Sequence, residues 1–122
     1  MMNTEEVGRK LVELCNKGAY EEATKSLYSE DIVSVEPQAM GNMPAEMKGF
    51  DAVCQKTKWW IDNHEVHSSK ATGPFVARDT FAVYFEIDVT DKNSGQRMQA
   101  SEVGIYQVKD GKVVREEFLP MA

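Results

Sequence analysis

A glutamate, Glu36, stands at the end of an apolar, strand-like run and directly before a proline in the stretch "DIVSVEPQAM". Proline ends a strand because it has no backbone N–H to donate to a neighbour. A carboxylate in this place is either a solvated strand end or a base held at the mouth of a pocket. In the second case, burial would raise its pKa toward the operating pH, and the group could carry a proton to and from a substrate. We take Glu36 as the candidate catalytic base.

A second carboxylate, Glu102, is the charged member of one strand phase. The other members of that phase are apolar, small or aromatic: Met98, Ala100, Gly104, Tyr106 and Val108. If this phase faces the core, Glu102 is a buried acid that can assist Glu36. The opposite phase is also half apolar, so the pattern leaves the facing of Glu102 open, and an outward Glu102 would simply be solvated.

The only two histidines occur in the stretch "HEVH", residues 64–67. Two residues separate them, whereas the zinc-binding helix motif needs three to bring both histidines to one face, so no metal site is expected. His64 suits a helix C-terminus, where a positive charge is favoured. His67 is a further candidate to assist Glu36, with a structural strand histidine as the alternative.

Large apolar side chains are numerous enough to line a pocket. The candidates are Trp60, Tyr106, Met40 and Met98. Aromatic and methionine side chains at helical or strand spacing often belong to the ordinary core, and that alternative stays open. The candidate site contains no phosphate loop or metal quartet, and we expect no cofactor.

The elements that must position these groups follow from the periodicity. Apolar residues at helical spacing, a capping start at "NTEE" and a stop at Gly18 predict a first helix. The remaining segments predict, in chain order, a helix in 19–29, a strand in 31–36, a loop over 38–49, a helix over 50–64, and strands over 65–78, 80–90, 97–108 and 112–119.

Turn residues connect the later strands. The pair Asp110-Gly111 predicts a two-residue type I′ hairpin, and Gly73-Pro74 predicts a bulge or bend in the first long strand. In the last strand, Arg115 and Glu117 share a face and are expected to belong to a ladder of ion pairs across the strands on the outer face of the sheet. Helices followed by consecutive hairpins predict an α+β fold, in which a curved antiparallel sheet wraps around the N-terminal helices to form a cone.

This order of elements, with "LYSEDIVSVEP", "MKGFDAV" and "YQVKDGKVVREEF" at the corresponding places, resembles the SnoaL-like members of the nuclear transport factor 2-like superfamily over nearly the whole chain. The superfamily includes ketosteroid isomerases, dehydratases, polyketide cyclases and proteins that only bind. The resemblance therefore implies a cystatin-like cone and a homodimer formed through the sheet, and leaves the reaction open.

The resemblance to ketosteroid isomerase implies a role for Glu36. That enzyme is a well-known example of how burial sets the protonation of the acids in an active site. Its aspartate base lies beside a proline after the first strand, and Glu36-Pro37 falls on that position. Its tyrosine and its protonated acid do not carry over, because Leu11 and Val103 or Gly104 stand near those positions.

Length and composition predict the number of domains and the kinds of partner. The 122 residues suffice for one core, so we expect a single domain over residues 1–122. A net charge of -6 without a basic stripe argues against nucleic acid, and the absence of a long apolar run argues against a membrane. Free buried thiols are expected at Cys15 and Cys54, which suits the cytoplasm.

Together these features predict a protein that binds a small apolar molecule in the cone. It would act as a cofactor-free isomerase, dehydratase or cyclase with Glu36 as base and Glu102 or His67 assisting. The alternative is a dimeric ligand-binding or assembly module without catalysis.

Overall fold

The computed structural model describes residues 1–121 and consists of three helices and six strands. The helices are α1 (Thr4–Asn16), α2 (Tyr20–Leu27) and α3 (Phe50–Asn63). The strands are β1 (Tyr28–Val35), β2 (Glu46–Lys48), β3 (His64–Ala77), β4 (Thr80–Asp91), β5 (Arg97–Lys109) and β6 (Lys112–Pro120).

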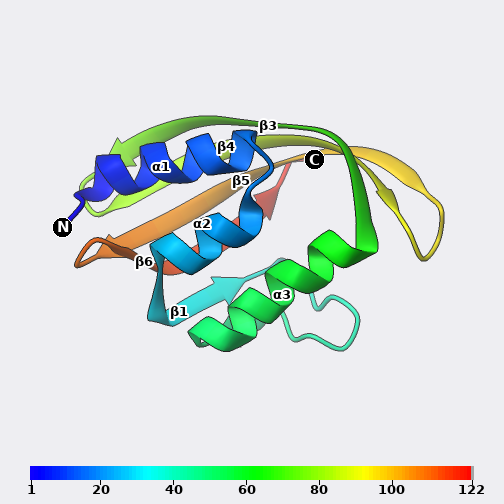
Figure 1. The fold of residues 1–122 in the computed structure, drawn as a ribbon, viewed down its shortest axis with the longest axis horizontal. Helices are drawn as coiled ribbons and strands as arrows, with labels where there is room; N and C mark the ends of the chain where they lie inside the picture. The colour runs from blue at the N-terminus through cyan, green and yellow to red at the C-terminus, as the bar shows by residue number, and fades with distance from the viewer. Residues whose placement is uncertain (122) are drawn as a thin grey trace.

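All six strands form one sheet in the order β2-β1-β6-β5-β4-β3. The sheet curves strongly, and the three helices lie in its concave side (Figure 1). The α+β fold expected from the sequence is therefore confirmed. Two details differ from the expectation: β1 pairs with β6 in parallel, and the segment expected to be a loop contains β2, which pairs antiparallel with β1.

Helix α1 begins where its capping residues require. The side chain of Asn3 accepts a hydrogen bond from the backbone of Glu6, and the Glu6 side chain accepts one from the backbone of Asn3, which forms a complete capping box. The buried side of the helix faces the long strands and contributes to the core through Val7, Leu11, Leu14 and Cys15. Burying these side chains fixes α1 against the concave side of the sheet.

The predicted turn and bend of the long strands are both present. Asp110 and Gly111 have φ values of 52° and 76°, as a type I′ turn requires, and connect β5 to β6 as a two-residue hairpin. The register between β3 and β4 shifts between Thr72 and Phe75, around Gly73-Pro74. This bend brings Pro74 close to Gly8 of α1, where an added Cβ would lie 2.8 Å from Pro74. The glycine thus allows helix and bend to meet.

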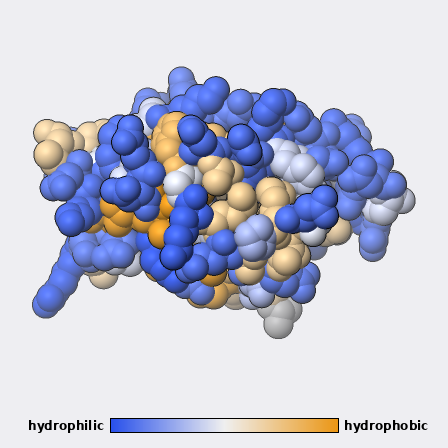
Figure 2. Space-filling model, turned by 90° about the horizontal axis from the view of Figure 1, so that it is seen from below, coloured by the Kyte–Doolittle hydropathy of each residue, from blue (hydrophilic) through white to orange (hydrophobic). Residues whose placement is uncertain are grey.

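Strands β3, β4 and β5 run past the helices at one end. The residues there, 65–68 and 96–100, are exposed. Seen from below, the molecule is hydrophilic at this end, on the right of the picture, whereas apolar residues gather in the middle of the face (Figure 2). The side chains of residues 65–68 and 96–100 therefore lie outside the cone.

Among residues 1–121, no helix is both long and apolar enough to span a bilayer.

Candidate functional site

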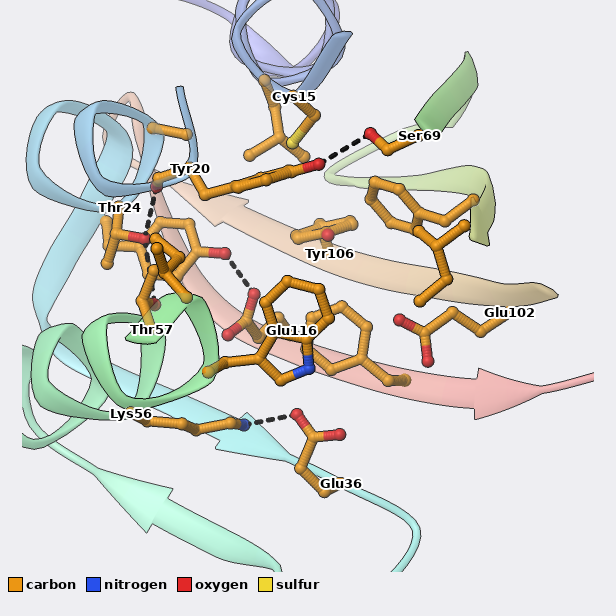
Figure 3. A pocket seen from close by; sticks show the side chains of 18 of the residues that line it. Cys15, Tyr20, Thr24, Glu36, Lys56, Thr57, Ser69, Glu102, Tyr106 and Glu116 are labelled. Carbon is orange, nitrogen blue, oxygen red and sulfur yellow. Dashed lines mark hydrogen bonds and ion pairs between the residues drawn. The ribbon is translucent and has the colours of Figure 1, made fainter. Parts of the chain in front are cut away.

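A cavity of about 310 Å³ lies between the helices and the concave face of the sheet (Figure 3). Its walls are mostly apolar and aromatic, and its polar residues come from several elements. It is lined by Leu11, Cys15, Tyr20, Ala23, Thr24, Tyr28, Glu36, Met40, Lys56, Thr57, Trp60, Ile61, Ser69, Phe85, Ile87, Glu102, Tyr106, Glu116 and Phe118. A volume of this size suits a small organic molecule.

A chain of polar contacts crosses one wall of the cavity. The Nζ atom of Lys56 lies 2.6 Å from Glu36 Oε2 and donates a hydrogen bond of 2.7 Å to Ser34 Oγ. Ser34 Oγ donates in turn to Glu116 Oε2 at 2.6 Å, and the hydroxyl of Tyr28 donates to the other oxygen of Glu116. Every member of this chain, which we call the polar chain, thus has a partner within the protein. Figure 3 shows the contact between Lys56 and Glu36.

Strand alternation and helical spacing bring the polar chain together. Ser34 and Glu36 are two residues apart at the end of β1, so both side chains point inward. Lys56 lies one turn after Val53 on the buried side of α3, and both are buried. Its long side chain places the ammonium group beside Glu36 and Ser34.

An irregularity in β6 turns Glu116 into the core. Val108 pairs with Val113, but Gln107 pairs with Arg115, so one residue of β6 is inserted between the two pairs. Val113 and Glu116 are consequently both buried, although they are three positions apart. Arg115 and Glu117 are left on the outer side, as expected, but they form an ion pair with each other along β6 at 3.0 Å, where a ladder across strands was expected.

The environment of Glu116 contains opposing effects. Burial raises its pKa, while the hydrogen bonds from Ser34 and Tyr28 and the nearby Lys56 lower it, with a net rise. Since both of its oxygens accept hydrogen bonds from hydroxyl groups, Glu116 is held as a carboxylate acceptor. Burial, followed by the charge of Glu116, raises the pKa of Tyr28 well above its ordinary value, so this phenol stays protonated and keeps donating.

Glu102 behaves differently from the other two acids. Burial raises its pKa to about 7, and repulsion from Glu36 and Glu116 adds to the effect, while Lys56 opposes it. Among residues 1–121 its side chain forms no hydrogen bond or ion pair, and Figure 3 shows its carboxyl group pointing into the cavity. Glu102 is therefore a carboxyl that changes protonation near neutrality and is free to contact a ligand.

Tyr106 offers a hydroxyl to the same space. Its side chain is 2% exposed and stacks on Phe81 with ring centroids 4.9 Å apart. The ring lies over Gly104, where an added Cβ would come within 2.7 Å of the ring and 3.0 Å of the hydroxyl oxygen. The hydroxyl has no partner in the described part of the chain, and burial raises its pKa well above the ordinary value. It is thus a neutral hydrogen-bond donor facing the cavity.

The structure brings together most of the residues that the sequence suggested. Glu36, Glu102, Trp60, Tyr106 and Met40 all line the cavity. The question of which way Glu102 faces is settled, because its strand phase points inward. The two acids differ in their contacts: Glu36 forms an ion pair with Lys56, whereas Glu102 forms no ion pair among residues 1–121.

The placement of His67 at the site is wrong. The register between β3 and β4 shifts at Val66 and Ser68, which leaves His67 as the inserted residue of a bulge, exposed and hydrogen-bonded to Thr90 at 2.7 Å. Met98 is also absent from the cavity wall. It shares the inward phase of β5 but lies at the end that runs past the helices, and is 40% exposed.

Four residues of the polar chain were not anticipated: Lys56, Ser34, Glu116 and Tyr28. A signal existed for Lys56, because it stands on the apolar side of its helix, one turn after Val53. For Glu116 the signals conflicted: an outward Arg115 and Glu117 would leave it facing inward, whereas strict alternation from Val113 predicts that it faces outward.

This arrangement suits acid–base chemistry more than metal chemistry. Among residues 1–121, no group of three or more histidine, cysteine, aspartate or glutamate side chains is placed to hold a metal ion. The cavity instead offers a titrating carboxyl, a neutral hydroxyl donor and apolar walls.

Comparisons with known proteins agree with this fold. The sequence profile of the SnoaL-like domain family matches residues 2–119. A candidate SnoaL-like polyketide cyclase from Mesorhizobium loti is 40% identical, with a TM-score of 0.88 and coverage of 96% of this chain and 98% of that one. No match is found among curated proteins.

More distant structures share the fold alone. A candidate isomerase from Bacillus subtilis is 22% identical, with a TM-score of 0.73 and coverage of 97% of this chain and 86% of that one. A protein with a cystatin-like fold from Xanthomonas campestris is 16% identical, with a TM-score of 0.81 and coverage of 99% and 92%.

Proposed function

The chain belongs to the SnoaL-like domain family, and from this premise we propose that it catalyses proton transfer on a small, mostly apolar carbonyl compound without a cofactor. Isomerisation, dehydration and cyclisation all begin with such a step. The Mesorhizobium loti protein, which is similar over almost its whole length, is a candidate polyketide cyclase, and this likeness supports the same class of chemistry.

One observation carries the proposal: Glu102 is an unpaired carboxyl with a pKa of about 7, facing an apolar cavity. In its deprotonated form it would remove a proton from the carbon next to the substrate carbonyl, and in its protonated form it would return one. A pKa near the operating pH allows both steps. This assigns to Glu102 the role that the sequence suggested for Glu36.

The hydroxyl of Tyr106 would stabilise the enolate that forms when the proton leaves. It is neutral and without a partner among residues 1–121, so it can donate to the substrate oxygen. A buried hydrogen-bond donor that points at the developing negative charge stabilises the transition state more than the same donor would in water. Glu36 would act indirectly, by holding Lys56 and by raising the pKa of Glu102 through its charge.

Deuterium exchange tests the proposal without knowledge of the natural substrate. The protein is mixed with small aromatic ketones such as phenylacetone in deuterated buffer, and loss of the proton signal next to the carbonyl is followed by NMR. We expect catalysed exchange whose rate rises with pH through about 7. Glu102→Gln should abolish it, while Glu86→Gln, on the exposed outer side of the neighbouring strand, should not change it.

The alternative function is ligand binding without catalysis. The ion pair between Glu36 and Lys56 favours it, because the acid that the sequence suggested as the base already has a fixed partner inside the protein. A wild-type protein that binds these ketones but exchanges no protons would support this alternative and contradict the proposal.

A further inference from the structure

Acids outnumber bases around the cavity. Three glutamates, Glu36, Glu102 and Glu116, line it, and Lys56 is the one basic residue among its lining residues. The remaining titratable groups that line it are the thiol of Cys15 on α1 and the phenols of Tyr20 on α2, Tyr28 on β1 and Tyr106 on β5. All four are neutral, because burial raises the pKa of each above its ordinary value.

The single ammonium group does not offset this excess. Lys56 already donates to Ser34 and contacts Glu36, so its charge is used within the polar chain. Glu116 is held as an acceptor by Tyr28 and Ser34. Once Glu102 is ionised, the cavity carries three negative charges against one positive charge, in surroundings where charges are poorly screened.

An independent feature points to a ligand in the same place. The hydroxyl of Tyr106, a side chain that is 98% buried, has no hydrogen-bond partner among residues 1–121 and faces the cavity (Figure 3). Its oxygen can accept a hydrogen bond as well as donate one. The rings of Trp60, Phe85 and Phe118 line the same cavity, and the faces of such rings attract cations; the ammonium group of Lys56 already lies 5.6 Å from the centroid of the Phe118 ring.

We infer that the ligand of this cavity carries a protonated amine on an apolar body, and that the unpaired Glu102 and the aromatic rings receive its ammonium group. This inference deepens the proposed function, on which it rests for placing the substrate against Glu102. An anionic ligand is disfavoured, because it would meet three carboxyl groups and an ammonium group that is already paired.

Binding of an amine in this cavity should depend on pH. An ammonium group beside Glu102 favours the ionised carboxylate, so amine binding and loss of the Glu102 proton reinforce each other. The affinity for an amine should therefore rise as pH increases through about 7, the pKa of Glu102 in the free protein. The affinity for a neutral ligand of the same shape should not rise in this way.

Three compounds of matched shape test the inference: phenethylamine, phenethyl alcohol and hydrocinnamate. Their affinities for the full chain are measured by isothermal titration calorimetry at about one pH unit above and below the pKa of Glu102. Above that pKa we expect the amine to bind roughly tenfold or more tightly than the alcohol, and the carboxylate to bind most weakly. In Glu102→Gln, the amine should lose most of its advantage and all of its pH dependence, whereas Glu86→Gln should keep both.

Several results would overturn the inference: an alcohol that binds as tightly as the amine, a carboxylate that binds tightest, or an amine that does not bind at millimolar concentration. The ketone exchange assay separates these failures from failure of the proposed function, because phenylacetone carries no amine. Exchange without amine preference would reject only the ligand class, and amine preference without exchange would reject only the catalysis.

Discussion

Replacing Glu102 by glutamine should stabilise the protein at alkaline pH and leave it nearly unchanged at acidic pH. The pKa of this carboxyl is about 7 in the folded protein, against an ordinary value of 4.5. Between these values the folded state binds more protons than the unfolded state, so the free energy of unfolding falls as pH rises through this window. At about 1.4 kcal/mol per pH unit, the full cost of the ionised group above pH 7 is roughly 3 kcal/mol.

Glutamine has nearly the same shape and carries no charge, so it should recover most of this cost. Some loss remains, because the amide is also a polar group without a partner, and we expect a net gain of about 2 kcal/mol near pH 8. Near pH 5 the wild-type carboxyl is mostly protonated, and the gain should shrink to a few tenths of a kcal/mol.

Urea unfolding of both proteins at these two pH values measures the effect, with Glu86→Gln as the matched control. Glu86 is exposed on the outer side of β4, and its replacement should change stability little at either pH. A Glu102→Gln protein whose gain is the same at both pH values, or which is destabilised near pH 8, would refute the reasoning that Glu102 is a costly buried charge.

Four further predictions follow from the packing and the polar chain. Lys56→Met should destabilise the protein by about 3–5 kcal/mol in urea unfolding, because it leaves Glu36, whose side chain is only 15% exposed, without its partner, and adding Glu36→Gln should recover much of the loss. Tyr28→Phe should cost about 1.5–3 kcal/mol by the same measurement, because it removes a hydrogen bond to the buried carboxylate of Glu116; a loss under 0.5 kcal/mol would show that the bond contributes little. Gly104→Ala should cost about 1–3 kcal/mol and weaken ketone exchange, since the new Cβ crowds the neighbouring tyrosine ring; unchanged stability and exchange would show that the ring can move freely. The homodimer through the sheet stays a prediction: gel filtration over a concentration series should give the dimer volume, and the monomer volume throughout would contradict it.

The fold could be predicted because its signals are local. The capping residues before α1 and the pair Asp110-Gly111 each determine the backbone around them, and both are found as expected. The parallel pairing of β1 with β6 could not be read in the same way, since it joins segments that are about 80 residues apart and leaves no mark on either strand alone.

The site could be predicted only where strand alternation is unbroken. Glu36 and Glu102 lie in regular phases and both reach the cavity. Bulges break the alternation elsewhere: one turns His67 outward, and another turns Glu116 inward. A bulge shifts every later side chain to the opposite face, and nothing in the sequence around these two positions indicates where the extra residue falls.

The ion-pair partner of Glu36 could not be predicted from the sequence either. The sequence suggested Glu36 as the base because it stands beside Pro37, but its ion-pair partner Lys56 comes from a helix 20 residues further along. Only the packed structure shows that Lys56 pairs with Glu36 and not with Glu102. The choice between the two acids is thus a property of tertiary structure.

The most direct test of the central claim is an NMR titration of the glutamate carboxyl carbons in the full chain, compared with the same titration of Glu102→Gln. We expect a carboxyl signal with a midpoint near pH 7 that disappears in the variant. If every glutamate titrates below about pH 5, or if the signal with the high midpoint persists in Glu102→Gln, then Glu102 is not the acid that the cavity holds ready for proton transfer.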